Sequence, residues 1–380
     1  MFKFLIKYAP IIYLLNTILL SIEFTFSIGY NIFLLIMVCY AFLIVVNPII
    51  INRVILNNSF KFFLYINIIN IIYFILFHNI YEIEAIKYVI ARFVQFSLLT
   101  TSIYYHFDYY RTHFLRHIVY VLFYLILLGF MINTNFSTVR YSGIVWNPNM
   151  LATFSTIGFG ITLILNNKIS RFYLLFLFVF FITSLLTGSR GVLIGIPLAF
   201  VFRYGFSYKN ILYAILGSLI YFSSISLELQ TSVDRFSEKE LFASRLINYQ
   251  IAFNTALEKP FVGHGLDKYS GETTQIPDYL IGLGKSLTAH NGYLSILIQY
   301  GFIFGFVIIF LIFRYCFLLF YFFMNSDNAY TLVYLYIVFY TLVGSIYETL
   351  ITGINDFHTI FFWLSISYLI FHKYQLKNAS

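Results

Sequence analysis

Residues able to do chemistry gather in one stretch of an otherwise apolar sequence, Ser244–Gly305. Arg245 stands near the start of a segment with helical spacing, and His290 precedes Asn291 where a polar loop enters an apolar run. Arginine offers a planar fork of donors that suits phosphate or diphosphate, and a neutral histidine can act as a general base. The sequence therefore predicts a candidate site in this stretch.

His290 is expected at the N-terminal end of the helix that begins after Asn291. The positive end of the helix dipole disfavours imidazolium there, whereas a nearby phosphate would favour it. The alternative is an ordinary histidine at a membrane interface. His264 lies between two glycines in the turn-rich run Pro260–Leu266, where a role in the turn is the favoured interpretation and substrate binding is the alternative.

Arg190 lies in Thr187–Gly191, a short polar run between two apolar segments that are each short for a membrane span. At about 1.5 Å per residue, such a pair leaves its tip within the outer leaflet. An arginine at that depth is costly without an anionic partner, and flanking glycines let a ligand approach the backbone closely. The alternatives are an arginine that extends to lipid headgroups and, for Arg245, a solvated charge on the polar face of its helix.

A weaker candidate groove involves Arg140, Asn147 and Asn149. The run Trp146–Asn149 has the signature of a turn that opens a helix, and Arg140 stands shortly before it on the expected outer face. These side chains could line a groove for substrate, although a plain loop explains them as well.

No metal or disulfide site is predicted. Glu82, Glu348 and Asp356 are expected to face outward, where solvated loop charge explains them better than a divalent cation site or a base. Cys39 and Cys316 both fall inside apolar runs, so neither a disulfide nor a thiolate metal site is indicated.

The elements that must position these residues are apolar helices. The chain has 380 residues, of which 61% are hydrophobic and 10% charged, against roughly 25% charged residues in soluble domains. Continuous apolar runs near the ~20 residues needed to cross a bilayer recur along it, whereas a β-barrel would show alternating ~10-residue segments. We predict an all-α polytopic membrane protein with about 12 transmembrane helices, at residues 4–22, 28–46, 60–78, 86–105, 117–133, 150–166, 172–187, 191–204, 211–227, 291–316, 330–347 and 357–371.

Basic residues predict the orientation of these helices. With the N-terminus inside, most basic residues outside the long polar loop fall on the inner side, so both termini are expected to be cytoplasmic. The net charge of +8 then reports topology rather than nucleic-acid binding. The predicted regions are a nine-helix part at 1–227, an extracytoplasmic loop at 228–290 with an amphipathic helix from Glu238 to Glu258, and a three-helix part at 291–380.

The sequence disfavours both an N-terminal signal peptide and a machine driven by ATP or by a nucleotide sugar. The N-terminal apolar run has no small-residue cleavage site after it, so a first spanning helix is expected rather than a signal peptide. The chain also lacks a Walker-type or dinucleotide-binding glycine pattern, which disfavours a machine driven by ATP or by a nucleotide sugar.

Several pieces, taken in order, resemble the bacterial family of O-antigen ligases and O-antigen (oligosaccharide repeat-unit) polymerases. The resemblance covers roughly residues 145–310. Its pieces are Asn147–Asn149 opening a helix, Ser189–Gly191, Arg245 on a helix that leads into Pro260–Gly265, and His290–Leu294 with Gly301 and Gly305.

The resemblance implies a membrane glycosyltransferase of the GT-C type with one large periplasmic or extracellular loop, in the bacterial cytoplasmic (inner) membrane. Such enzymes move a glycan from an undecaprenyl-diphosphate carrier to an acceptor hydroxyl with inversion, and no metal or other cofactor is expected. The resemblance assigns Arg190 and Arg245 to the diphosphate leaving group and His290 to the acceptor hydroxyl as its base. The remaining substrate-binding candidates are Arg140, Asn147, Asn149, His264 and Asn291.

Within the family we predict the polymerase, because diverse, aromatic-rich chains are typical of it; the ligase, which hands glycan to lipid A-core, is the alternative. A chain-length regulator is a candidate partner. A non-catalytic flippase or transporter of the same lipid-linked glycan is another alternative, but it should carry ionisable residues at mid-membrane, and the predicted helix centres are almost free of charge, with Arg92 the nearest exception. A scaffold subunit is the third alternative.

Overall fold

A computed structural model of the chain describes residues 2–136, 140–166, 170–213, 215–216, 239–274 and 288–379. These residues form helices and no strands, apart from isolated bridges between Ile22 and Val145 and between Glu272 and Thr288. The α-helices are α1 (Phe2–Leu20), α2 (Phe26–Val46), α3 (Pro48–Ile55), α4 (Lys61–Phe77), α5 (Ile83–Thr112), α6 (Phe114–Ile132), α7 (Pro148–Leu165), α8 (Arg171–Leu186), α9 (Arg190–Tyr204), α11 (Lys239–Glu258), α13 (Gly292–Phe323), α14 (Ala329–Gly344) and α15 (Phe357–Ala379).

The prediction of a helical membrane protein is confirmed. Five segments in the described part of the chain are long and apolar enough to cross a membrane, and three shorter apolar helices accompany them. The five are Glu23–Val46, Asn58–Phe77, Phe114–Ile132, Pro148–Leu165 and Gly292–Phe323. The count of twelve spans, the GT-C architecture and the membrane side of each loop remain predictions, and most of the helix predicted at 211–227 lies outside the described residues.

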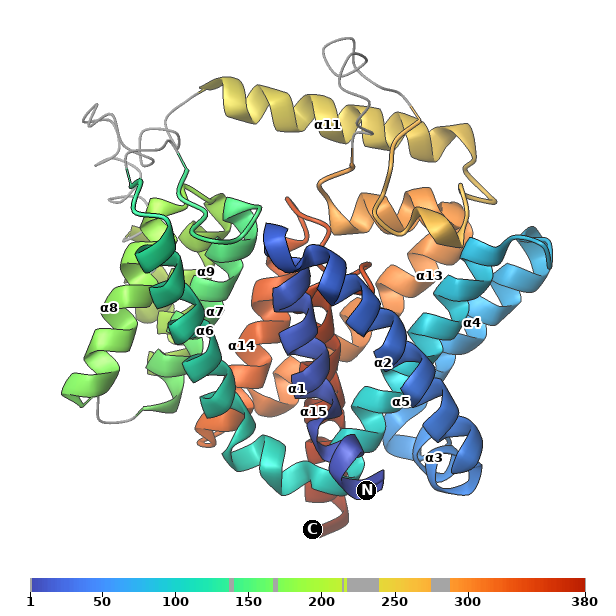
Figure 1. Ribbon diagram of the computed structural model, residues 1–380, viewed down its shortest axis with the longest axis horizontal. Helices are drawn as coiled ribbons and strands as arrows, with labels where there is room; N and C mark the ends of the chain where they lie inside the picture. The colour runs from blue at the N-terminus through green and yellow to red at the C-terminus, as the bar shows by residue number, and fades with distance from the viewer. Residues whose placement is uncertain are drawn as a thin grey trace.

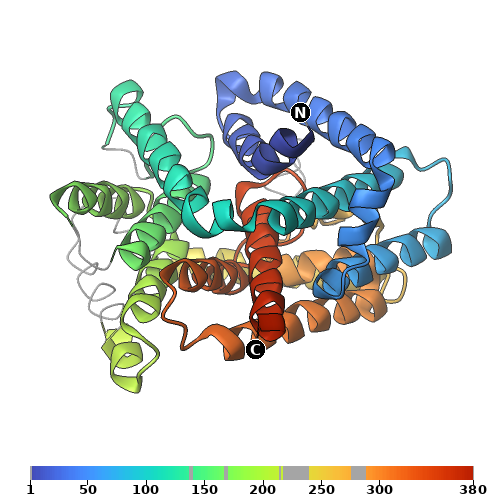
Figure 2. The same cartoon turned by 90° about the horizontal axis from the view of Figure 1, so that it is seen from below.

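The bundle is organised around α15. Residues 357–372 of this helix are buried on all sides, and α15 contacts α1, α5, α13 and α14. Figure 2 shows α15 in the middle of the bundle. Next to it, α14 also packs on α7 and α9, and thereby joins the group α6–α9 to the rest of the molecule. Both termini lie at one end, and α11 lies across the opposite end (Figure 1).

The long helix α13 is broken at Gly301, and this break explains the glycine-rich turn Pro260–Gly265. Gly301 has φ 69° and ψ 178°, which removes the helical bond from the Phe302 amide to the Ile298 carbonyl. The Phe302 amide donates to the Pro260 carbonyl instead, at 2.6 Å, and the Ile298 carbonyl accepts from the His264 amide at 2.8 Å. The turn therefore satisfies the backbone groups that the break exposes.

The amphipathic helix predicted from Glu238 to Glu258 is observed as α11, except that Glu238 is outside the described residues. Its small side chains Ala252 and Ala256 are buried in a cluster with residues of α13. Leu246 and Leu257 are 66% and 48% exposed and form an apolar face directed away from the protein, although Phe253 also contacts Phe302 of α13. Such a face suits contact with the membrane interface.

Candidate functional site

Three helix N-termini carry the candidate site, together with the loop 345–356 that joins α14 to α15. Asn147 is the N-cap of α7, Ser189 is the N-cap of α9, and Asn291 is the N-cap of α13. Each helix N-terminus presents a partial positive charge of backbone N–H groups. Hydrogen bonds of nearby side chains connect all three to the loop.

A line of polar contacts runs from the end of α8 to the start of α13. Arg140 donates from Nε to the Thr187 carbonyl at 3.2 Å and from Nη2 to the Asn149 side-chain oxygen. Asn149 donates from Nδ2 to Oε1 of Glu348 at 2.7 Å. Oε2 of Glu348 lies 3.3 Å from Nδ1 of His290. We call Arg140, Asn149, Glu348 and His290 the outer network, after the membrane side that the sequence predicts for them.

His290 is held in a conformation that few residues adopt. Its φ of +44° makes it the one non-glycine residue with positive φ in the described part of the chain. Backbone strain of this kind costs of order 1–3 kcal/mol and is concentrated at functional sites. Neighbouring backbone bonds hold it, because the Ala289 amide donates to the Gly271 carbonyl at 2.8 Å and the Gly292 amide donates to the Ser345 carbonyl at 2.7 Å. The side chain of His290 is 35% exposed, which leaves it accessible.

The three other predicted substrate-binding residues, Asn291, Asn147 and His264, also have hydrogen-bonded side chains. The side-chain oxygen of Asn291 accepts from the amides of Tyr293 and Leu294, both at 2.9 Å. Its Nδ2 donates to the Ile346 carbonyl at 2.8 Å. Asn291 therefore both caps α13 and fastens the loop that carries Glu348.

The side-chain oxygen of Asn147 accepts from the Asn149 amide at 2.9 Å and so caps α7. The ring of His264 is bonded through Nε2 to the Thr255 carbonyl at 2.8 Å, and its side chain is only 10% exposed. His264 thus joins the last turns of α11 to the broken segment of α13, away from the outer network. These contacts favour structural roles for both residues.

Arg190 is the first residue of α9 and is half-buried. Thr187, three residues earlier, is fully buried, and its carbonyl accepts the bond from Arg140. Gly188 has φ 58°, which forms the tight turn between α8 and α9. The loop before Arg190 is therefore joined directly to the outer network.

Arg245 lies in α11, one helical turn before Tyr249. The Tyr249 hydroxyl donates to the Ile346 carbonyl at 2.7 Å, two residues before Glu348. α11 is therefore fastened to the same loop as Asn291, and position 245 lies in the helical turn next to this contact. The side chain of Arg245 is outside the described part of the molecule.

Glu348 is a residue of this network that the sequence analysis considered and interpreted as a solvated loop charge. The interpretation as a solvated loop charge is wrong for it, because its side chain is 25% exposed and contacts both His290 and Asn149. The other two carboxylates lie elsewhere: Glu82 pairs with His78, and Asp356 lies beside Gly353, at the end of the loop before α15. A local signal for Glu348 is absent, since its partners lie 58 and 199 residues away in the sequence.

Arg92 holds the loop 345–356 from inside the bundle. It is 3% exposed and donates to the Thr352 carbonyl and, at 2.6 Å, to the side-chain oxygen of Gln95. Gln95 in turn donates to the Ile354 carbonyl at 3.2 Å. Arg92, the charged residue nearest to a predicted helix centre, thus helps to hold the loop in place.

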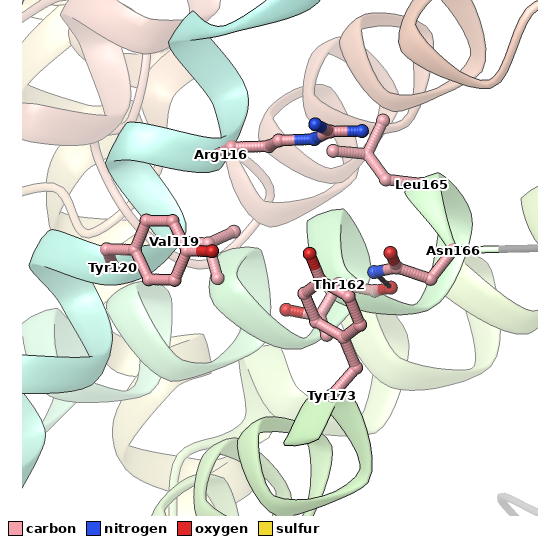
Figure 3. Close-up of a pocket in the computed structure, with 7 residues that line it drawn as sticks. All are labelled: Arg116, Val119, Tyr120, Thr162, Leu165, Asn166 and Tyr173. Carbon is pink, nitrogen blue, oxygen red and sulfur yellow. Dashed lines mark hydrogen bonds between the residues drawn. The ribbon is translucent and has the colours of Figure 1, made fainter. Parts of the chain in front are cut away.

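A separate small cavity lies at the other end of α7 from Asn149. Figure 3 shows its lining, which is Arg116, Val119, Tyr120, Thr162, Leu165, Asn166 and Tyr173. At about 10 Å³ it has room for about one water molecule. It is too small for a sugar, and we assign no part of the candidate site to it.

Part of the chain matches a known protein family. Residues 174–310 match the sequence model of the family described as O-antigen ligase. No curated protein matches the chain, and no solved structure matches it. The matched range contains Arg190, Arg245 and His290, whereas Arg140, Asn149 and Glu348 lie outside it.

Proposed function

We propose, from the match of residues 174–310 to the family described as O-antigen ligase, that the protein is a membrane glycosyltransferase of the inner membrane. Its donor is a glycan linked to undecaprenyl diphosphate, and its acceptor is a hydroxyl of a second lipid-linked repeat unit. The product is a longer lipid-linked polysaccharide, so the proposed activity is polymerisation. The site lies at the end of the bundle opposite the termini, which is the outer face in the proposed orientation.

Arg190 and Arg245 are proposed to bind the diphosphate. Arg190 stands at the N-terminus of α9, where the helix dipole adds to its charge, and anions bind readily at such positions. A planar guanidinium can make two hydrogen bonds to one phosphate. Donors fixed in place before the reaction stabilise the negative charge that develops as the anomeric bond breaks.

His290 is proposed to take the proton of the acceptor hydroxyl. The observation that carries the proposal is that His290 is joined, through Glu348, Asn149 and Arg140, to the Thr187 carbonyl in the loop before Arg190. In this proposal the base and the loop before the leaving-group arginine therefore belong to one hydrogen-bonded network. Inverting transfer needs these two groups on opposite sides of the anomeric carbon.

The second candidate is the ligase, the activity named in the description of the matching family. A ligase and a polymerase share the donor and differ only in the acceptor. The same residues would therefore carry either reaction, and the acceptor is what an experiment must identify.

The test is a deletion of the gene, followed by complementation and gel analysis of the surface glycan. A polymerase predicts that the deletion strain keeps single repeat units on the final acceptor and loses the ladder. A ligase predicts that all repeats are lost from the acceptor while lipid-linked polymer accumulates. An unchanged ladder would overturn the proposed function.

His290→Ala in the complementing gene should fail to restore the product while the protein level in the membrane stays normal. The matched control is His113→Ala, an exposed histidine at the start of α6. Restoration of a full ladder by His290→Ala would show that the base is another residue.

A further inference from the structure

Each carboxylate oxygen of Glu348 has a neighbour in the outer network, and the chemistry of these two contacts determines which ring nitrogen of His290 carries the proton. A carboxylate only accepts hydrogen bonds. Asn149 donates to Oε1 at 2.7 Å, so the contact of 3.3 Å between Oε2 and Nδ1 of His290 requires a proton on Nδ1. A neutral imidazole has one N–H. Its other nitrogen, Nε2, therefore carries the lone pair that a base needs.

The orientation of Asn149 is fixed from both sides. Its amide oxygen accepts from the guanidinium of Arg140, so its NH₂ group must face Glu348. Arg140 is fixed in turn by the Thr187 carbonyl, at 3.2 Å. The orientation of the Glu348 carboxylate is thus set from the loop that precedes Arg190.

The backbone around Glu348 is also fixed. Its amide donates to the Gly344 carbonyl at 3.1 Å, and the Ile346 carbonyl accepts from both Asn291 and Tyr249. The loop that carries the carboxylate is therefore fastened to α13 and α11. Since His290 directly precedes the N-cap of α13, both partners of the contact are held by the same short stretch of structure.

We propose that Glu348 is a positioning residue for His290, a role that rests on the proposed function. It holds the ring with Nδ1 protonated and Nε2 available, and its charge stabilises the imidazolium formed during the reaction, as aspartate does for the histidine of serine proteases. Asn149 and Arg140 hold Glu348 in the orientation that this requires.

In the proposed step, the acceptor hydroxyl oxygen forms a bond to the anomeric carbon, and its proton passes to Nε2 of His290. The bond from the anomeric carbon to the diphosphate oxygen breaks, and its electron pair leaves with the diphosphate. His290 ends as imidazolium beside the Glu348 carboxylate and returns its proton to solvent before the next cycle.

Glu348→Gln is the discriminating variant, because it keeps the shape of the side chain and removes the charge. Glutamine can still accept from Asn149, but its NH₂ group then faces Nδ1 of His290 and favours the tautomer with the proton on Nε2. We expect kcat to fall by about 10²- to 10⁴-fold, the range that a positioned general base supplies. KM and the melting temperature should stay near the wild-type values, because donor binding and the other contacts remain.

The assay uses the full chain purified in detergent, with lipid-linked oligosaccharide extracted from the deletion strain as the substrate. Glu348→Asp keeps the charge at a shorter reach and should recover part of the loss. Glu84→Gln is the control, since Glu84 is an exposed carboxylate paired with Lys87 on the surface of α5. In a His290→Ala background, Glu348→Gln should cause no further loss, because the two residues act as one unit.

The outcomes separate the two proposals. Full kcat in Glu348→Gln, with His290→Ala inactive, would overturn the positioning role and leave the proposed function intact. A loss that appears in the melting temperature and in KM to the same degree as in kcat would show a structural role only. An unchanged product in the deletion strain would overturn the proposed function itself.

Discussion

Gly263 and Gly301 lie against each other at the break in α13, so closely that a Cβ atom on Gly263 would come within 2.4 Å of the Gly301 amide nitrogen and 2.5 Å of the Gln299 carbonyl oxygen. Both glycines also have positive φ, 76° and 69°. The contact keeps the Pro260–Gly265 turn against the broken helix. That turn follows directly on α11, the helix that carries Arg245.

Gly263→Ala is expected to destabilise the protein more than strain alone explains. Positive φ costs alanine about 1 kcal/mol, and overlap with fixed backbone atoms adds several kcal/mol. Gly205→Ala is the matched control, since Gly205 has φ 95° and no atom lies within 4 Å of its added Cβ. Melting of the purified protein should show a much larger fall for Gly263→Ala, and equal falls would contradict the close contact.

Arg190→Lys should lower activity although the charge is conserved. An ammonium cannot make the paired hydrogen bonds of a guanidinium, and loss of one fixed donor to a developing charge costs about 10²- to 10³-fold in kcat. The measurement is the rate at which accumulated lipid-linked oligosaccharide is consumed. Arg203→Lys, in the last turn of the same helix, should retain activity, and wild-type turnover in Arg190→Lys would remove this residue from the leaving-group site.

Asn149→Asp tests how the outer network contributes to stability and to the positioning of His290. Aspartate still accepts from Arg140 but places a second carboxylate against Glu348, so both stability and activity should fall. The lost bond and the repulsion together should cost about 1–3 kcal/mol.

Adding Glu348→Gln to Asn149→Asp should restore stability but only part of the activity. The glutamine NH₂ group can donate to the carboxylate introduced at position 149, which re-forms the bond between the two positions and leaves the amide oxygen facing Nδ1 of His290. The required tautomer of His290 is then kept, whereas the charge that stabilises its imidazolium stays absent. Melting temperature and turnover are measured on the wild type, the two single variants and the double variant. Turnover restored to the wild-type rate would show that the charge of Glu348 contributes nothing to the step.

We expect the loop that follows α11 to be held less stably in acid, because Glu82 helps to hold it through His78. Its hydrogen bond from His78, with further help from the Asn79 amide, lowers the pKa of Glu82. Nε2 of His78 accepts from the Leu266 amide at 3.0 Å, so the ring joins Glu82 to that loop. A lowered pKa means that this contribution to stability is present at neutral pH and is lost as the pH falls through the pKa of folded Glu82.

Between about pH 5 and pH 3, the range around the ordinary pKa of glutamate, the melting temperature of Glu82→Gln should therefore fall less steeply than that of the wild type. Glu84→Gln, an exposed neighbour, should keep the wild-type dependence. The same slope in all three proteins would show that the contact between Glu82 and His78 contributes nothing to folding.

The helices were predictable because each property that defines them is local. Apolar runs give their extent, and Asn147 and Asn291 mark where α7 and α13 begin. The predicted helix at 86–105 ends earlier than α5, which continues to Thr112. The polar residues near the end of α5 hide this continuation in the sequence, and the helix is broken at His106.

The contacts of the outer network were not predictable in the same way. Asn149 meets Glu348 across 199 residues, and neither residue stands in a pattern that reveals the other. Arg140, Asn149 and His290 were each found as weak candidates, whereas Glu348 needed the fold to bring α7, α13 and the loop before α15 together. The side chain of Arg245 lies outside the described residues, so its role stays a prediction.

The outward-facing side chains of α11 have a mechanical consequence. Leu246 and Leu257 are exposed on α11 and suit the level of a bilayer where headgroups meet acyl chains, while Ala252 and Ala256 hold the helix to α13. We therefore expect bilayer thickness to act on α11, and through the bond between Tyr249 and Ile346 on the loop that carries Glu348. Turnover should then differ between liposomes made from lipids of short and of long acyl chains.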